Sequence, residues 1–153
     1  MKFYLVQHGE AVPEEIDPYR PLSPKGKDNV IKMATFLKEV NVKPAEIWHS
    51  TKTRAKQTAE ILSNKLKPVA GLKQREGLAP NDPPEKILEE LIARGEDLMI
   101  VSHLPFLQKL ASLLVFGSSD KSLIGFKKGS IVCLERKDNG WEICFFLTSD
   151  LLR

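Results

Sequence analysis

The segment DLMIVS, at positions 97–102, is the feature that most restricts the fold of this chain. Its continuous apolar run is typical of a strand that lies in the centre of a sheet and is buried on both faces. An almost wholly apolar helical pattern, PFLQKLASLLVFG, begins at Pro105, shortly after that strand. A buried strand followed by an apolar helix indicates a parallel sheet that is covered by helices.

The other segments repeat this alternation of strand and helix patterns. We expect strands at 2–7 and 45–50, a helix over SPKGKDNVIKMATFLKEV at 23–40, and a helix over TRAKQTAEILSNKL in the segment that starts at Thr51. Residues 67–82 predict a loop, with a short strand within 69–75. DPPEKILEELIARG predicts a helix at 82–95, and SIVCLERKDNGWEICFFL predicts two strands joined at Asn139-Gly140.

Capping signals mark the ends of two of these helices. Ser23 is placed to cap the first one. Asp82 and Glu85 have the spacing of a capping box, with Pro83 at the first helical position and Gly95 at the end. Together these elements predict an α/β fold. It is a single domain over 1–153 with three α/β/α layers, built on a mainly parallel sheet that a C-terminal antiparallel hairpin extends.

The composition excludes several classes of protein. The 153 residues are 42% hydrophobic and 28% charged, which is ordinary for one globular domain. A scattered net charge of +3 is too weak for nucleic-acid binding, although it suits an anionic small group or an acidic partner. Because no signal peptide or bilayer-spanning run is visible, we expect a cytoplasmic protein without membrane contact. Cys133 and Cys144 lie in predicted strands without zinc-ligand spacing, so we expect buried, reduced thiols.

Polar residues follow three of the predicted strands. His8 follows the first strand, residues 50–54 follow the second, and His103 follows DLMIVS. In parallel α/β sheets, ligands bind at the carboxyl ends of the strands, so we expect these residues to share one crevice. A neutral imidazole can attack phosphorus, and the planar guanidinium of Arg54 matches a phosphoryl group. The sequence therefore predicts a phosphate site with a nucleophile.

Four motifs carry a resemblance to a known family. LVQHGEA, RPLSPKG, STKTRAKQTAEIL and IVSHLPFL occur in this order along nearly the whole chain. The chain resembles the histidine phosphatase (phosphoglycerate-mutase-like) superfamily, and its short length and SHLP motif resemble the SixA-type branch, the protein phosphohistidine phosphatases. This resemblance implies that His8 is transiently phosphorylated, that Arg54 grips phosphate and that His103 assists at the phosphoryl oxygens. It gives metal ions no task, and we expect no cofactor.

Gln7 departs from the family pattern Arg-His-Gly, in which the arginine is a second phosphate fork. A glutamine amide still donates hydrogen bonds but brings no charge. Losing one preorganised donor commonly costs ~10²–10³ in rate, so we expect a slower enzyme rather than an inactive one. Gly9 and Arg20 are further candidates for phosphate binding. Arg20, in YRPLSPKG, lies where a second cation can reach the cleft, and a surface loop arginine is the alternative.

Glu76, in QREGLAP, is the nearest candidate for the general acid of the superfamily. A phosphohistidine substrate needs such an acid less than a phosphoester does, because imidazole leaves more readily than an alkoxide.

The favoured function is a metal-independent phosphatase that acts through phospho-His8 on phosphohistidine of a signalling or phosphotransfer protein. The short loop at 67–82 leaves little chain for a lid, and an open cleft favours a phosphate presented on a protein. A phosphatase for small phosphorylated substrates is one alternative, which Glu76 would support if it reached the cleft. A non-catalytic module that binds a phosphorylated or sulfated group is the other, because Gln7 replaces the arginine.

Overall fold

The computed structural model describes residues 1–152 as one six-stranded sheet with helices packed against it. In chain order the elements are β1 (Lys2–Gln7), α1 (Pro24–Glu39), β2 (Glu46–His49), α2 (Thr53–Leu66), β3 (Leu72–Gln74), α3 (Pro84–Arg94), β4 (Leu98–Ser102), α4 (Phe106–Phe116), β5 (Ile131–Lys137), β6 (Gly140–Leu147) and a 3₁₀ helix, η1 (Ser149–Leu151). Every predicted strand and helix is present, with small differences at the ends. Within residues 1–152, each helix is too short or too polar to cross a membrane.

The strand order of the sheet is β3-β2-β4-β1-β5-β6. The first four of these strands are parallel, while β5 runs antiparallel to β1 and β6 antiparallel to β5. The strand predicted from DLMIVS is β4, which lies between β2 and β1 and is buried along its whole length. The mainly parallel α/β sheet with a C-terminal hairpin is therefore confirmed. The carboxyl ends of β1, β2 and β4 share one edge.

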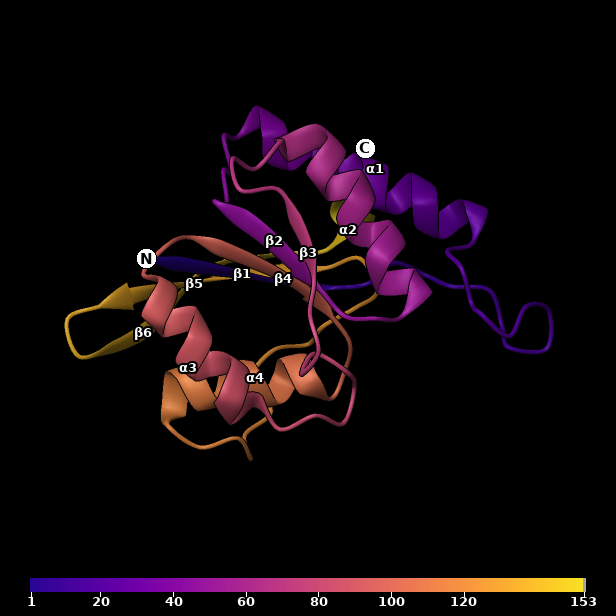
Figure 1. The fold of residues 1–153 in the computed structure, drawn as a ribbon. Coiled ribbons are helices and arrows are strands. Elements are labelled where there is room, and N and C mark those ends of the chain that lie inside the picture. Colours follow the sequence, from indigo (N-terminus) through magenta and orange to yellow (C-terminus); the bar gives the residue numbers. More distant parts are fainter. Residues whose placement is uncertain (153) are drawn as a thin grey trace.

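The helices form two layers, with α1 and α2 on one face of the sheet and α3 and α4 on the other (Figure 1). Alternate residues of β1 point to opposite faces, as the pleat of a strand requires. Tyr4 and Val6 belong to the core under α1 and α2, whereas Phe3 and Leu5 belong to the core under α3 and α4. Both faces of the central strands are thus closed to water, and the polar chemistry is left to the strand ends.

The start of α1 is locked against the loop that follows β1. Ser23 caps the helix as predicted: its Oγ accepts from the Gly26 N–H at 3.0 Å and donates to Glu10 Oε2 at 2.8 Å. A Cβ at Gly26 would collide with the backbone of Glu10, and a Cβ at Gly9 would lie 2.8 Å from a methyl group of Val30. This close packing holds the loop behind β1 in one place.

The capping box predicted for the helix at 82–95 is wrong. Pro83 is extended, with φ −69° and ψ 136°, and α3 begins at Pro84 without a side-chain cap. The reason is that a residue before proline is disfavoured in the helical region, so Pro83 cannot be the first helical residue. Asp82 turns back instead, and its Oδ2 accepts from the Ala79 N–H at 2.9 Å. Gly95 ends the helix in a left-handed conformation, as predicted.

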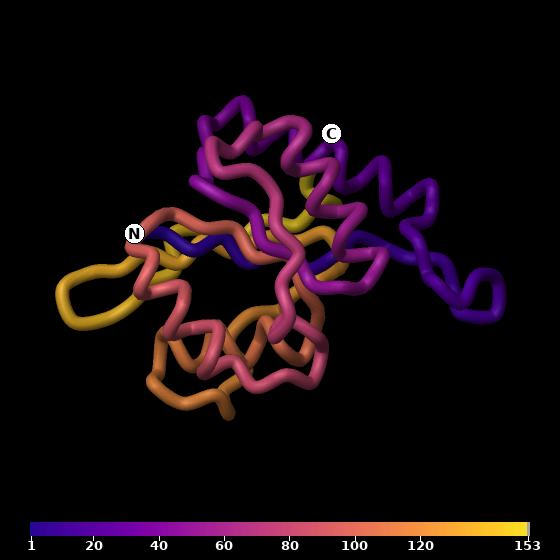
Figure 2. The backbone as a smooth tube through the Cα atoms, viewed as in Figure 1, coloured from indigo at the N-terminus to yellow at the C-terminus, as the bar shows by residue number. Residues whose placement is uncertain are grey.

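The β5–β6 hairpin extends past the helices at the opposite end of the molecule from the loop between β1 and α1 (Figure 2). Both cysteines lie in this hairpin and form no disulfide. Cys133 is buried, as predicted, but Cys144 is exposed, so the prediction of two buried thiols is wrong. Cys144 is in β6, an edge strand whose side chains mostly reach solvent.

Candidate active site

Two of the predicted site histidines lie side by side at the carboxyl edge of the sheet. β1 and β4 are parallel neighbours with Gln7 opposite Ser102, so the next residue of each strand, His8 and His103, arrives at the same level. Their ring centroids are 5.0 Å apart, and both side chains are buried. The structure therefore brings together two imidazoles that are far apart in the sequence.

The ring of His8 is held by its own loop. His8 Nδ1 lies 2.7 Å from the carbonyl oxygen of Gly9, and because a carbonyl can only accept, Nδ1 carries the hydrogen. The other ring nitrogen, Nε2, then holds a lone pair. Burial lowers the pKa of His8 to about 4, with the Gly9 hydrogen bond opposing the shift and the charges of Arg54, Lys128 and Arg20 adding to it. At neutral pH the ring is uncharged, which is the form that a nucleophile needs.

His103 has a different partner, a side-chain hydroxyl. Its Nε2 lies 2.6 Å from Ser50 Oγ, and its Nδ1 is buried without a partner among the described residues. Burial lowers the pKa of His103 to about 3, and repulsion from Arg54, and from His8 when that ring is protonated, acts in the same direction. This imidazole is also neutral at neutral pH.

Arg54 comes from the first turn of α2, which begins at this edge of the sheet. Its side chain is half-buried, and its Nε has no hydrogen-bond partner within residues 1–152. Burial and the nearby charge of Arg20 both lower the pKa of Arg54. Arg20 has left-handed backbone (φ 49°), and its Nε donates to the Val12 carbonyl at 3.2 Å. Its charge acts on both histidines, so Arg20 belongs to the same cluster of cations.

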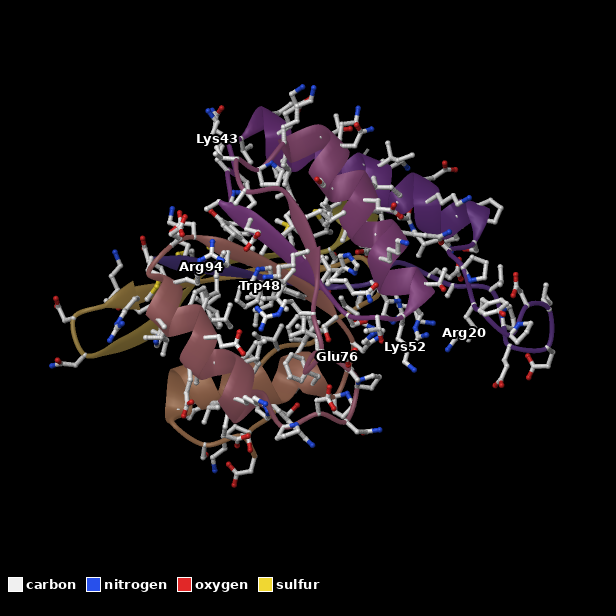
Figure 3. The ribbon with its side chains drawn as sticks, viewed as in Figure 1. Arg20, Lys43, Trp48, Lys52, Glu76 and Arg94 are labelled. Carbon is white, nitrogen blue, oxygen red and sulfur yellow. The ribbon has the colours of Figure 1, made fainter. Side chains whose placement is uncertain are left out.

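Two lysines that the sequence analysis did not select also act on this edge. The charge of Lys128 lowers the pKa of His8, and that of Lys52 lowers the pKa of His103. In Figure 3, Arg20 and Lys52 lie in the right half of the view, whereas Lys43 and Arg94 lie in the left half. None of the ion pairs found in residues 1–152 uses Arg20, Lys52, Arg54 or Lys128. Unpaired cations around neutral imidazoles form a surface suited to an anion.

Gln7 sits at the end of β1 with a buried side chain, and its Oε1 has no partner among the described residues. Its backbone is firmly tied, because its N–H donates to the Ser130 carbonyl at 3.1 Å and its carbonyl accepts from the Gly129 N–H at 3.0 Å. The Gly129 N–H also donates to the His8 carbonyl at 3.0 Å. Position 7 therefore directly precedes His8 in the chain, on a rigid backbone, and lacks the charge of an arginine.

Thr58 is a residue that the sequence analysis missed as part of the site. Its Oγ1 accepts from the Gly9 N–H at 3.0 Å and donates to the Arg54 carbonyl at 2.8 Å. It thus joins the His8 loop to the first turn of α2. Gly9 was a candidate for phosphate binding in the sequence analysis, and its N–H is occupied by this bond. The motif TRAKQTAEIL contained Thr58, but its helical spacing indicated only a buried position.

Glu76, the candidate general acid, follows β3 at the same edge of the sheet, and its side chain is exposed (Figure 3). It borders a surface hollow together with Arg75 and Lys86. The strongest influences on the pKa values of the two site histidines are burial, a hydrogen bond and cationic groups, with no carboxylate among them. Within residues 1–152, no group of three or more His, Cys, Asp or Glu could hold a metal ion.

The chain is similar to several known proteins. A model of the histidine phosphatase superfamily (branch 1) matches residues 3–80. An uncharacterized protein of Picosynechococcus sp. is 32% identical over 142 aligned positions, in an alignment that covers 88% of this chain and 84% of that protein. The solved structure of the protein histidine phosphatase SixA complexed with tungstate has a TM-score of 0.87 at 23% identity and covers 100% of both chains. A mycobacterial glucosyl-3-phosphoglycerate phosphatase with VO₃ has a TM-score of 0.75 at 15% identity, covering 94% of this chain and 97% of that one.

The match to the histidine phosphatase superfamily shows that the chain is a phosphatase of the hydrolase class, and the two imidazoles and the cations at the edge of this sheet are consistent with that class. It belongs to the histidine phosphatase superfamily, branch 1. The resemblance stated from the four motifs is confirmed, and the fold is that of SixA.

Proposed function

We propose that the chain is a metal-independent phosphatase that works through a phosphohistidine intermediate on His8 and acts on phosphohistidine presented by a protein. The observation that carries the mechanism is the tautomer of His8. Its Nδ1–H is donated to the Gly9 carbonyl at 2.7 Å, which leaves the Nε2 lone pair for attack on phosphorus. The pKa of about 4 keeps this lone pair available at neutral pH.

The reaction has two steps. In the first, the Nε2 lone pair of His8 forms a bond to phosphorus while the bond from phosphorus to the leaving group breaks. The leaving nitrogen or oxygen keeps the bonding electrons and takes up a proton from solvent, and the water that attacks in the second step returns one to solvent. In the second, water attacks the phosphorus of phospho-His8, the P–N bond breaks, and its electrons return to Nε2 as inorganic phosphate leaves. No step requires a metal ion.

Arg54, His103 and Arg20 would stabilise the oxygens of the transferring group. Arg54 Nε and His103 Nδ1 are buried polar atoms without partners in residues 1–152, which suits groups that bind an anion. Preorganised donors and cations of this kind stabilise the charge that redistributes in phosphoryl transfer. Gln7 would contribute an amide donor without charge.

Two features favour phosphohistidine on a protein as the substrate. First, none of the hydrogen bonds or ion pairs of His8, His103 and Arg54 within residues 1–152 involves a carboxylate, and an imidazole leaving group depends less on a general acid than an alkoxide. Second, the segment after β3 is held down on the sheet: Leu78 is fully buried, and its carbonyl accepts from Ser102 Oγ at 2.6 Å. A segment fixed in this way is poorly suited to close over the imidazoles as a lid, which favours a phosphate presented on a large partner.

Trapping the intermediate tests the mechanism. The protein is exposed to phosphoramidate and to a phosphohistidine-bearing protein, and peptides are mapped by mass spectrometry under mildly basic conditions that preserve P–N bonds. We expect an acid-labile phosphate on His8 and none on His49, a buried histidine elsewhere in the chain. Turnover of phosphohistidine without label on His8, in a rapid-quench experiment with excess substrate, would contradict the proposal. Saturable phosphate binding without turnover would support the non-catalytic module instead.

A phosphatase for small phosphoesters is the second candidate. The observation that favours it is the position of Glu76, exposed at the same edge of the sheet as the imidazoles. Glu76→Gln separates the two functions. It should leave phosphohistidine hydrolysis unchanged under our proposal, and should slow phosphoester hydrolysis if Glu76 is a general acid.

A further inference from the structure

Ser50 makes a contact that the proposed mechanism does not explain. Its Oγ is 2.6 Å from His103 Nε2, and the residue is 1% exposed. The other hydrogen bond of this hydroxyl comes from the Lys52 N–H at 3.3 Å, which can only donate. Among the described residues, His103 Nε2 is thus the one hydrogen-bonded atom that can accept the hydroxyl hydrogen of Ser50.

The two neutral tautomers of His103 differ in how many buried groups stay unpaired. With the hydrogen on Nε2, the ring donates to Ser50, and both the Ser50 hydroxyl hydrogen and the Nδ1 lone pair lack partners. With the hydrogen on Nδ1, Ser50 donates to Nε2, and only Nδ1–H lacks a partner within residues 1–152. Because an unpaired buried polar group is costly, the second arrangement is favoured.

We propose that Ser50 is a positioning residue that holds His103 as the Nδ1–H tautomer, so that Nδ1–H donates to an oxygen of the transferring phosphoryl group. This inference rests on the proposed function of the same site. A hydroxyl suits the task because it can also rotate and accept from Nε2 when His103 gains a proton beside a bound dianion. Arg54 Nε is also buried without a partner among the described residues, and a guanidinium nitrogen can only donate. Arg54 Nε–H and His103 Nδ1–H would therefore donate to the same anion.

The tautomer can be measured directly, without any assay of activity. Ring ¹⁵N shifts at pH 7 are recorded for the parent protein, Ser50→Ala, Ser50→Thr and Ser102→Ala, with His103 assigned from a His103→Asn sample. We expect Nδ1–H in the parent and in Ser50→Thr, and a substantial Nε2–H population in Ser50→Ala. Ser102→Ala is the matched control, because it removes a buried hydroxyl next to His103 that bonds the Leu78 carbonyl instead. It should leave the tautomer unchanged.

Binding of tungstate, measured by calorimetry, tests the consequence. Removing a partner that orients a metal-bound imidazole typically costs about 10- to 100-fold in affinity, and by analogy we expect Ser50→Ala to weaken tungstate binding by about tenfold. Ser50→Thr should restore it, and Ser102→Ala should not change it.

Two results would overturn the inference: an Nε2–H tautomer in the parent protein, or Ser50→Ala with the parent's tautomer and tungstate affinity. The parent spectrum decides even if Ser50→Ala fails to fold. Failure of the proposed function is distinguishable, because it would appear as missing phospho-His8 while the tautomer and tungstate results stand as expected.

Discussion

The ends of β1 and β4 carry the two site imidazoles, and they hold them by different means. The ring of His8 donates to a backbone carbonyl, that of Gly9, whereas the ring of His103 meets a side-chain hydroxyl, that of Ser50. A carbonyl can only accept, so His8 keeps one tautomer whatever happens in the site. A hydroxyl both donates and accepts, so His103 can change from a neutral to a protonated ring without losing its partner. The fixed ring suits a nucleophile and the adaptable ring suits a donor to a changing charge.

The surroundings of His8 combine groups that are fixed by hydrogen bonds with one group that has no partner. The His8 loop is held by backbone bonds from Gly129 and by Thr58, while its neighbour Gln7 has a buried amide oxygen without a partner among the described residues. The backbone around His8 is thus rigid, whereas the side chain at position 7 is the group that differs from the family pattern. This distinction indicates where substitutions should abolish the reaction and where they should only tune it.

The largest effect is expected at the nucleophile. His8→Ala should abolish hydrolysis and leave the fold intact, because the residue follows the strand and lies outside the two hydrophobic cores. His103→Ala should retain a slow reaction, reduced by ~10²–10³ as is typical when one transition-state donor is lost. Steady-state rates and circular dichroism of both variants measure the contrast. Substantial turnover by a well-folded His8→Ala protein, or equal loss in both variants, would break the distinction between the two rings.

The next largest effect is expected at Arg54. Arg54→Ala should weaken tungstate binding and lower kcat/KM by ~10²–10³, because it removes a cation and a donor together. Arg54→Lys is the matched control, since lysine keeps the charge but lacks the planar fork. We expect the lysine variant to lie between the parent and alanine proteins in both measurements. If Arg54→Ala binds tungstate as tightly as the parent, the guanidinium does not face the anion.

The sequence predicted the edge on which the site lies because parallel strands align their ends. DLMIVS and the segment before His8 are apolar runs, and their pairing puts His8 and His103 at one level. Those two residues and Arg54 are therefore predictable from the sequence alone. The position of Ser50 in the crevice was predicted as well, but its 2.6 Å contact with His103 was not, and neither were the roles of Thr58 and Lys128. These roles depend on atoms 53, 49 or about 120 positions away in the chain.

The errors of prediction came from competing local rules. Asp82 and Glu85 have capping-box spacing, but the steric effect of Pro84 on Pro83 delays the helix, and Asp82 then bonds to Ala79. The sequence around Cys144 predicts a strand, but it does not reveal that β6 is an edge strand with most of its side chains in solvent. The start of α3 and the exposure of Cys144 both depend on neighbouring residues that only the folded structure brings together.

A moderate effect is expected from restoring the family residue at position 7. Gln7→Arg should raise turnover by up to ~10²-fold, since it adds a preorganised donor and a charge beside His8. Gln7→Lys separates the two contributions, because it returns the charge without the fork. Rates with phosphoramidate and with a phosphohistidine protein measure the gain. An unchanged or lower rate in both variants would mean that Arg20 or Lys128 already fulfils this role and that the pocket is adapted to glutamine.

The smallest expected effect is a shift of the acid limb of the rate profile. His8 must be neutral to attack, and its pKa is about 4, lowered mainly by burial and further by the charges of Arg54, Lys128 and Arg20. Above this pKa the reactive form predominates, and below it the rate should fall as the ring takes up a proton. An added cation at position 7 disfavours the charged ring, so Gln7→Arg should move the limb of kcat/KM to lower pH.

The comparison is made with a phosphoester that is stable in acid and over the pH range in which circular dichroism shows both proteins folded. Ionisation of the substrate contributes equally to both profiles and cancels in the difference between them. The direction follows from like-charge repulsion, and its size depends on how fully the new guanidinium is screened by solvent. Coincident limbs, or a limb at higher pH in Gln7→Arg, would mean that position 7 does not act on His8 electrostatically. The one part of the site that responds to a change of charge would then be His103, whose ring contacts the hydroxyl of Ser50.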